Sequence, residues 1–152
     1  MPVEARDLMT RDVITVTPET PVSEIAKLLS EHNISGVPVV DEDGKLRGII
    51  SEADLVVRAA RPRFPRYIPF LEGVIFLENP AHYEQEIQKM LAVAAADIMT
   101  EKVVTAPPDA SVEELATLMT ERNVNRIVII EAGRIAGVVT RGDIVRTLAE
   151  SE

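Results

Sequence analysis

The sequence twice places a hydroxyl residue three positions before an aspartate, as Ser51 with Asp54 and as Thr140 with Asp143. At the start of a helix, this spacing is typical of a capping box, in which side chains satisfy backbone N–H groups that lack an intrahelical partner. The same arrangement suits a nucleotide, because a helix N-terminus attracts phosphate and a carboxylate accepts two hydrogen bonds from a ribose diol. The two roles are compatible, so each motif predicts a helix start and a candidate ligand site.

The elements that would position these motifs form a tandem duplication. Residues 7–41 align with 97–131 and residues 44–56 with 133–145, and 16 of the 48 aligned positions are identical. Each copy reads β-α-β-β-α, with the last helix beginning at the motif. We predict an α+β, sandwich-like fold in which the two repeats share one core about a pseudo-twofold axis, because about 50 residues is too few for a secure core. The chain then divides into repeat 1 at 1–60, a connecting insert at 61–96 and repeat 2 at 97–152.

Local signals mark where the first helix of each repeat begins and ends. In the second repeat, Ser111 and Glu114 have the spacing of a capping box at the start of the first helix, and Thr20 is the corresponding cap in the first repeat. Asn33 and Asn123 should end these helices, because asparagine tolerates the left-handed backbone conformation common at helix ends.

The order of these motifs resembles the cystathionine-β-synthase-type (CBS) domain, and two copies in tandem resemble a Bateman module. The resemblance rests on Asp7-Leu-Met-Thr10, on Asp97-Ile-Met-Thr100 and on the two Gly-x-x-Ser/Thr-x-x-Asp motifs, in the same order twice. It implies that AMP, ADP, ATP or S-adenosylmethionine binds as a regulatory ligand in clefts between the copies, with no cofactor required. It also implies a homodimer that pairs through its helical faces and regulates another protein, whose identity the sequence does not give.

The resemblance further implies which residues bind. The aspartate position contacts ribose, the Ser/Thr position lies near phosphate, Arg126 reaches phosphate, and Thr15 and Thr105 border the base. By repeat, site 1 comprises Thr15, Gly36, Val37, Pro38, Ser51 and Asp54, and site 2 comprises Thr105, Arg126, Thr140, Arg141 and Asp143.

The two sites differ in charge, because Gly36 and Glu52 occupy the positions of Arg126 and Arg141 in the first repeat. We therefore expect an anionic ligand to prefer the cleft anchored by Asp143. Gly36 would instead allow the backbone to approach an adenine ring. Structural alternatives remain open: Arg126 is equally a solvated charge at a strand edge, and Thr15 and Thr105 are equally strand residues selected for β-branching.

The insert contains the arginines at positions 61, 63 and 66 and all five aromatic residues of the chain. We expect the aromatic side chains to anchor it on the body or on a second subunit, and we expect a helix over 81–96. An alternative function is a ligand-free scaffold that docks a protein through residues 61–96. A weaker alternative is nucleic-acid binding through residues 58–70.

Composition excludes several other classes. The net charge of −9 disfavours nucleic acid and anionic membranes as partners, and the absence of cysteine excludes disulfides and thiolate metal sites. His32 and His82 have no metal-ligand spacing, and no nucleophile elbow or phosphate loop occurs. We therefore predict no catalytic residue, no metal site and no enzymatic activity. Without a visible signal peptide or a membrane-length apolar run, we expect a cytoplasmic protein with no membrane contact.

Overall fold

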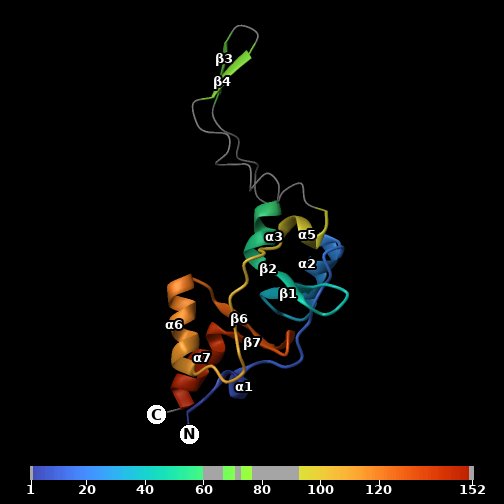
Figure 1. Ribbon diagram of the computed structural model, residues 1–152. Helices are drawn as coiled ribbons and strands as arrows, with labels where there is room; N and C mark the ends of the chain where they lie inside the picture. Colours follow the sequence, from blue (N-terminus) through green and yellow to red (C-terminus); the bar gives the residue numbers. More distant parts are fainter. Residues whose placement is uncertain (1, 60–66, 71–72, 77–92, 151–152) are drawn as a thin grey trace.

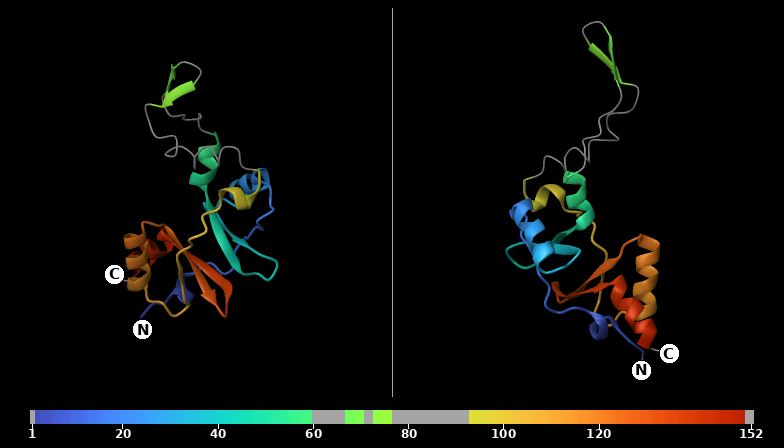
Figure 2. Two further views of the ribbon diagram at one scale, coloured as in Figure 1. Left: turned by 45° about the horizontal axis from the view of Figure 1, so that its top comes forward. Right: turned by 180° about the vertical axis from the view of Figure 1, so that it is seen from behind.

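The computed structural model describes the backbone of residues 2–59, 67–70, 73–76 and 93–150, and the side chains of residues 2–57 and 93–150. Its architecture is two similar halves, each with strands flanked by a pair of helices (Figures 1 and 2). The first half contains α2 (Val22–Glu31), β1 (Gly36–Val40), β2 (Leu46–Ser51) and α3 (Glu52–Ala59). The second half contains β5 (Thr105–Ala106), α6 (Val112–Arg122), β6 (Arg126–Glu131), β7 (Arg134–Thr140) and α7 (Arg141–Glu150).

Each half is built on an antiparallel hairpin. The hairpin leads directly into the helix that begins at the Ser/Thr-x-x-Asp motif, which is α3 in the first half and α7 in the second. β1 pairs with β2, with Gly36 opposite Ser51, and β6 pairs with β7, with Arg126 opposite Thr140. The glycine turns are confirmed, because Gly44 and Gly133 both have φ of 78°. The β-rich run that opens each repeat is shorter than expected: β5 pairs in parallel with β6 in the second half, whereas the first half has only an isolated bridge from Val16 to β1.

The predicted helix ends are largely confirmed. Ser111 Oγ accepts from the Glu114 N–H at 3.1 Å, Glu114 Oε2 accepts from the Ser111 N–H at 3.3 Å, and Asn33 and Asn123 have φ of 52°. Thr20 does not cap α2. Its Oγ1 instead accepts from the Thr17 N–H at 3.0 Å, because the helix begins one residue later than predicted, with Pro21 at the cap position.

The buried side chains form two clusters, one in each half, and not the single core that the sequence predicted. Each cluster is completed by the short helical segment at the start of the other repeat. Ala5 of α1 (Ala5–Leu8) and Met9 are buried in the second half, whereas Ala95 and Ile98 of α5 (Ala95–Ile98) are buried in the first. The two halves are therefore joined by exchanged segments.

Backbone and side-chain contacts hold the exchanged segments in place. Thr10 exchanges two backbone hydrogen bonds with Val138 of β7, and Thr100 exchanges two with Ile49 of β2. Met9 lies over Gly137, and Met99 lies over Gly48, at distances that leave no space for a Cβ atom. These paired contacts follow the predicted pseudo-twofold relation.

Within the insert, the structure describes a hairpin of β3 (Tyr67–Phe70) and β4 (Gly73–Phe76), set apart from the two halves (Figure 1). The sequence did not predict these strands. Most of the predicted helix over 81–96, and the side chains expected to anchor the insert, lie outside the described residues. In the described part of the chain, no helix has the length and hydropathy to span a bilayer.

Candidate functional site

Two clefts lie where the halves meet, and each is lined by residues from both repeats. The Asp54 cleft has a volume of about 330 Å³, and the Thr140 cleft has a volume of about 250 Å³. The Asp54 cleft is lined by Ile49, Ser51, Asp54, Thr100, Lys102, Val103, Val104, Asn123, Val124, Asn125, Arg126 and Arg141. The Thr140 cleft is lined by Thr10, Asp12, Val13, Ile14, Asn33, Ile34, Ser35, Gly36, Pro38, Ile49, Arg126, Val138 and Thr140.

The two clefts are pseudo-equivalent. Eight positions of the Thr140 cleft recur 90 residues later in the Asp54 cleft, and Ser51 and Thr140 are likewise related. The eight pairs are 10 and 100, 12 and 102, 13 and 103, 14 and 104, 33 and 123, 34 and 124, 35 and 125, and 36 and 126. The duplication has therefore produced one site twice, and the functional differences lie in the few positions that have diverged.

Asp54 lies in the first turn of α3, where its carboxylate faces the helix N-terminus. Its Oδ2 accepts hydrogen bonds from the Ser51 N–H at 2.9 Å and from Ser51 Oγ at 3.3 Å. The side chain is buried, with 7% of its surface exposed, and it borders the Asp54 cleft. These bonds fix the carboxylate as a rigid acceptor in a partly desolvated place, which is the property needed to bind a ribose diol.

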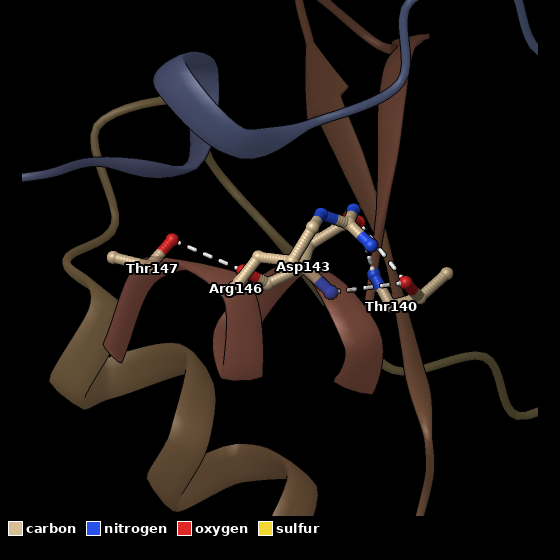
Figure 3. A network of polar contacts seen from close by, with 4 residues as sticks. All are labelled: Thr140, Asp143, Arg146 and Thr147. Atoms are coloured by element: carbon tan, nitrogen blue, oxygen red, sulfur yellow. Dashed lines mark hydrogen bonds and ion pairs between the residues drawn. The ribbon is translucent and has the colours of Figure 1, made fainter. Parts of the chain in front are cut away.

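Asp143 has the same position in α7 but a different neighbour (Figure 3). Its Oδ2 accepts from the Thr140 N–H at 2.8 Å and from Thr140 Oγ1 at 3.1 Å, and its Oδ1 accepts from Arg146 Nη2 in an ion pair. Val57 occupies the position of Arg146 in the first repeat. Thr140 lines its cleft, whereas Asp143 does not, and Arg146 occupies an oxygen that a ligand hydroxyl would need.

Arg126 crosses the pseudo-twofold axis and lines both clefts. Its Nη2 donates to Ser35 Oγ, and its guanidinium covers Gly36, where a Cβ atom would be 2.8 Å from Arg126 Cζ. Burial lowers the pKa of Arg126 from its ordinary value, and the carboxylates of Glu52 and Asp54 oppose this effect. Positions 36 and 126 therefore meet across the axis, and the absence of a side chain at Gly36 leaves the space that the Arg126 guanidinium occupies.

Charge distinguishes the clefts in the opposite sense to the prediction. Among the described residues, Lys102, Arg126 and Arg141 all line the Asp54 cleft, whereas Asp12 takes the place of Lys102 in the Thr140 cleft. The cations that were expected beside Asp143 therefore line the Asp54 cleft instead, and the cleft that an anion prefers remains a prediction. The sequence prediction placed all residues of one site in one repeat. In the structure the repeats face each other, so the Ser/Thr-x-x-Asp motif of one repeat lines a cleft together with residues of the other repeat.

The remaining predicted site residues are placed as follows. Gly36 and Pro38 line the Thr140 cleft together with Thr140, and Ser51 lies with Asp54 in the Asp54 cleft. Thr15 and Thr105 are exposed and line neither cleft, and Val37 is fully buried in the core of the first half. Whether any of these residues contacts a ligand remains a prediction.

Sequence reasoning missed residues that the twofold relation brings to the Asp54 cleft. Lys102 supplies a charge there, and Val103 and Val104 supply apolar surface. The signal was the repeat itself, since a twofold axis between two copies places the first segment of one beside the motif of the other. No group of three or more histidine or acidic residues in the described ranges is arranged to hold a metal ion.

Known proteins match the chain over both repeats. The CBS domain family model matches residues 5–61 and 95–150. A CBS domain-containing protein of Dictyostelium discoideum is 32% identical, over 97% of this chain and 92% of the relative. The uncharacterized protein YlbB of Bacillus subtilis (strain 168) is 34% identical, over 91% of this chain and 78% of the relative.

Solved structures share the fold. CBSX2 in complex with AMP has a TM-score of 0.79 over 97% of both chains at 24% identity, which shows the fold alone. The CBS domain pair of protein MJ0100, in complex with 5′-methylthioadenosine and S-adenosyl-L-methionine, has a TM-score of 0.75 over 100% of both chains at 26% identity. With both repeats matched in sequence and in structure, the chain belongs to the CBS domain family and is a tandem CBS pair.

Proposed function

We propose that this CBS pair is a regulatory module that binds an anionic adenosyl compound in the Asp54 cleft. The observation that carries the proposal is the meeting of one buried carboxylate with Lys102, Arg126 and Arg141 around a cavity of about 330 Å³. Small-molecule sites begin at about 300 Å³, so the volume suits a nucleotide. The MJ0100 pair, which was solved in complex with 5′-methylthioadenosine and S-adenosyl-L-methionine, supports an adenosyl ligand.

The cleft offers a partner for each part of such a ligand. Asp54 accepts the ribose hydroxyls, and Ser51 lies beside it at the start of α3. The cations attract a phosphate or another anionic group, and arginine can bind it with two hydrogen bonds. Ile49, Val103 and Val104 provide apolar surface for the base.

Regulation follows from the position of the cleft between the halves. Asp54 and Ser51 come from the first repeat, whereas the cations come from the second. A ligand that contacts both must favour one relative arrangement of the halves over others, and a partner protein with different affinities for these arrangements would detect the change. The role is therefore regulatory and not catalytic.

Isothermal titration calorimetry with AMP, ADP, ATP and S-adenosylmethionine tests the proposal. Asp54→Asn should weaken binding about tenfold to a hundredfold, because a hydrogen bond to a charged group contributes roughly 1.5–3 kcal/mol. The matched control is Asp143→Asn, which changes the same position of the other repeat and should leave binding in the Asp54 cleft intact. The proposal is wrong if none of the four binds below millimolar concentration, or if both variants weaken binding equally.

We also propose a homodimer that pairs through α3 and α7. Val56 on α3 and Val145 on α7 occupy equivalent positions of the two repeats and are 65% and 59% exposed, and Leu148 on α7 is 60% exposed. Large apolar side chains at equivalent exposed positions are typical of an interface. Val145→Glu should convert a dimer to a monomer in light-scattering measurements, and a wild-type protein that is already monomeric would contradict the proposal.

A further inference from the structure

Arg126 is the one charged side chain shared by both clefts in the described part of the chain. It starts β6, within the wall of the Asp54 cleft, but its guanidinium extends across the axis to the first repeat. There it contacts Ser35 and Gly36, which line only the Thr140 cleft. The position of one side chain therefore affects the shape of both sites.

The guanidinium limits the space of the Thr140 cleft. The guanidinium of Arg126 lies over Gly36 and fills the space where a side chain at position 36 would be. The backbone of Gly36 is therefore not open to a ligand while Arg126 is in this position. In this state the Thr140 cleft has a volume of about 250 Å³, which is smaller than the roughly 330 Å³ of the pseudo-equivalent Asp54 cleft. Withdrawal of Arg126 would enlarge the smaller cleft beside Gly36.

We propose that Arg126 couples the two clefts: an anion in the Asp54 cleft draws the guanidinium away from Ser35 and opens the Thr140 cleft to a second, uncharged nucleoside. This inference rests on the proposed function of the Asp54 cleft. Arg126 is thus a positioning residue, which decides when the second site is available.

The competition for Arg126 favours the anion. The bond to Ser35 has a neutral hydroxyl as acceptor, whereas a phosphate is an anionic acceptor that can bind the guanidinium through two parallel hydrogen bonds. The guanidinium already lies in the field of Glu52 and Asp54 and is partly desolvated, as its lowered pKa reflects. An anion between Lys102 and Arg141 would therefore gain a third cation, at the cost of the one hydrogen bond from Arg126 to a neutral hydroxyl.

The chemistry of the Thr140 cleft defines the second ligand. Its walls are mainly apolar, with Val13, Ile14, Ile34 and Val138. Once Arg126 has moved, the charged side chain left in its described lining is Asp12, which repels phosphate. The neighbouring Asp143 is neutralised by Arg146. An uncharged purine nucleoside fits this lining better than a nucleotide.

The test uses the full chain with inorganic pyrophosphate as the anion and adenosine as the nucleoside. Methyl NMR assigns each binding event, because Ile14 and Val138 line only the Thr140 cleft, whereas Val103 and Val124 line only the Asp54 cleft. Saturating pyrophosphate should tighten adenosine binding at Ile14 and Val138 about tenfold, which is within the usual range of coupling between sites. By linkage, adenosine should tighten pyrophosphate binding by the same factor.

Two variants test the role of Arg126 itself. Arg126→Gly introduces the glycine that the first repeat has at the equivalent position 36. Adenosine should then bind the Thr140 cleft tightly without pyrophosphate. Ser35→Ala removes the hydroxyl acceptor and should raise adenosine affinity in the same direction by a smaller factor. Ser30→Ala is the matched control, because Ser30 is exposed on α2 and lines neither cleft.

The outcomes separate this inference from the proposed function. If pyrophosphate binds among Lys102, Arg126 and Arg141 but adenosine affinity does not change with it, the coupling is wrong and the Asp54 cleft remains an anion site. If adenosine fails to bind the Thr140 cleft in Arg126→Gly and in Ser35→Ala, the second site is wrong. If pyrophosphate does not bind at all, the coupling is wrong, whereas the proposed function is decided separately by the calorimetry with the four adenosyl compounds.

Discussion

Gly137→Ala is expected to destabilise the protein by separating an exchanged segment from the sheet it covers. A Cβ atom at this position would lie 2.7 Å from Met9 Cγ and Sδ and 2.8 Å from the carbonyl oxygen of Thr10. Met9 can move, since its side chain is flexible. Thr10 cannot move cheaply, because its backbone exchanges hydrogen bonds of 2.9 and 3.1 Å with Val138.

The magnitude follows from these contacts. Overpacking of a well-packed site costs about 1–3 kcal/mol, and loss of one backbone hydrogen bond adds about 1 kcal/mol. Replacing glycine also lowers the entropy of the unfolded chain, which offsets about 0.4–1 kcal/mol. The net loss should be about 1–3 kcal/mol in the free energy of unfolding. Gly48→Ala should cost a similar amount, since Met99 Sδ and the Thr100 carbonyl oxygen lie 2.8 and 2.9 Å from its Cβ position.

Urea denaturation followed by circular dichroism measures the effect. With a slope of about 2 kcal/mol per molar urea, the midpoint should fall by about 0.5–1.5 M. The control is Gly142→Ala near the start of α7, where the nearest atoms lie at 3.5 and 3.7 Å and alanine favours the helix. Its midpoint should rise or stay constant. A Gly137→Ala midpoint equal to that of the wild type, or an equal fall in Gly142→Ala, would refute the proposed contact between the exchanged segment and β7.

Three further predictions concern caps, protons and charge. Ser111→Ala removes the hydroxyl that accepts from the Glu114 N–H and should lower the free energy of unfolding by about 1 kcal/mol in the same urea assay, so an unchanged midpoint would contradict the cap. The Ala94 and Val93 N–H groups lower the pKa of Asp97, so the unfolded state binds more protons than the folded state in acid. The contribution of Asp97 to the free energy of unfolding should therefore be retained above about pH 4 and lost as the pH falls through its folded-state pKa. Asp97→Asn should flatten this acid loss in melting temperatures measured from pH 5 to 3, and an unaltered slope would assign the loss to other groups. Lys102→Glu should weaken ATP binding at least about fivefold and adenosine binding much less. Asp12→Asn in the other cleft should leave the affinity for ATP unchanged. Calorimetry at low and high salt measures both effects.

Signals confined to one repeat predicted the local structure well. Glycine turns, the Ser111 capping box and the left-handed asparagines each depend on a few neighbouring residues, and all of them are confirmed. The hairpin of β3 and β4 was not predicted, and Pro69 within it is atypical of a strand. A two-stranded hairpin nevertheless has an unpaired edge on each strand, where proline is tolerated.

The composition of the clefts could not be predicted in the same way. Motif spacing shows that Ser51 and Asp54 lie on one helix start, but it does not show which copy supplies the facing residues. Lys102 is 48 positions from Asp54 in the sequence, and only the twofold axis brings them together. The difference in residue type between Gly36 and Arg126 was visible, whereas the contact between them was not.

The exchanged segments have a consequence for how such a protein can exist as a single repeat. Ala5 and Met9 are buried in the core of the second half and not in that of their own repeat, and each core is finished by the segment that opens the other repeat. A lone repeat could therefore complete its core only by domain swapping with a second molecule, which makes a closed symmetric dimer. In the fused chain, the same exchange postpones completion of the first core until residues 95–98 have been synthesised, so the first repeat cannot finish folding before the second begins to be made.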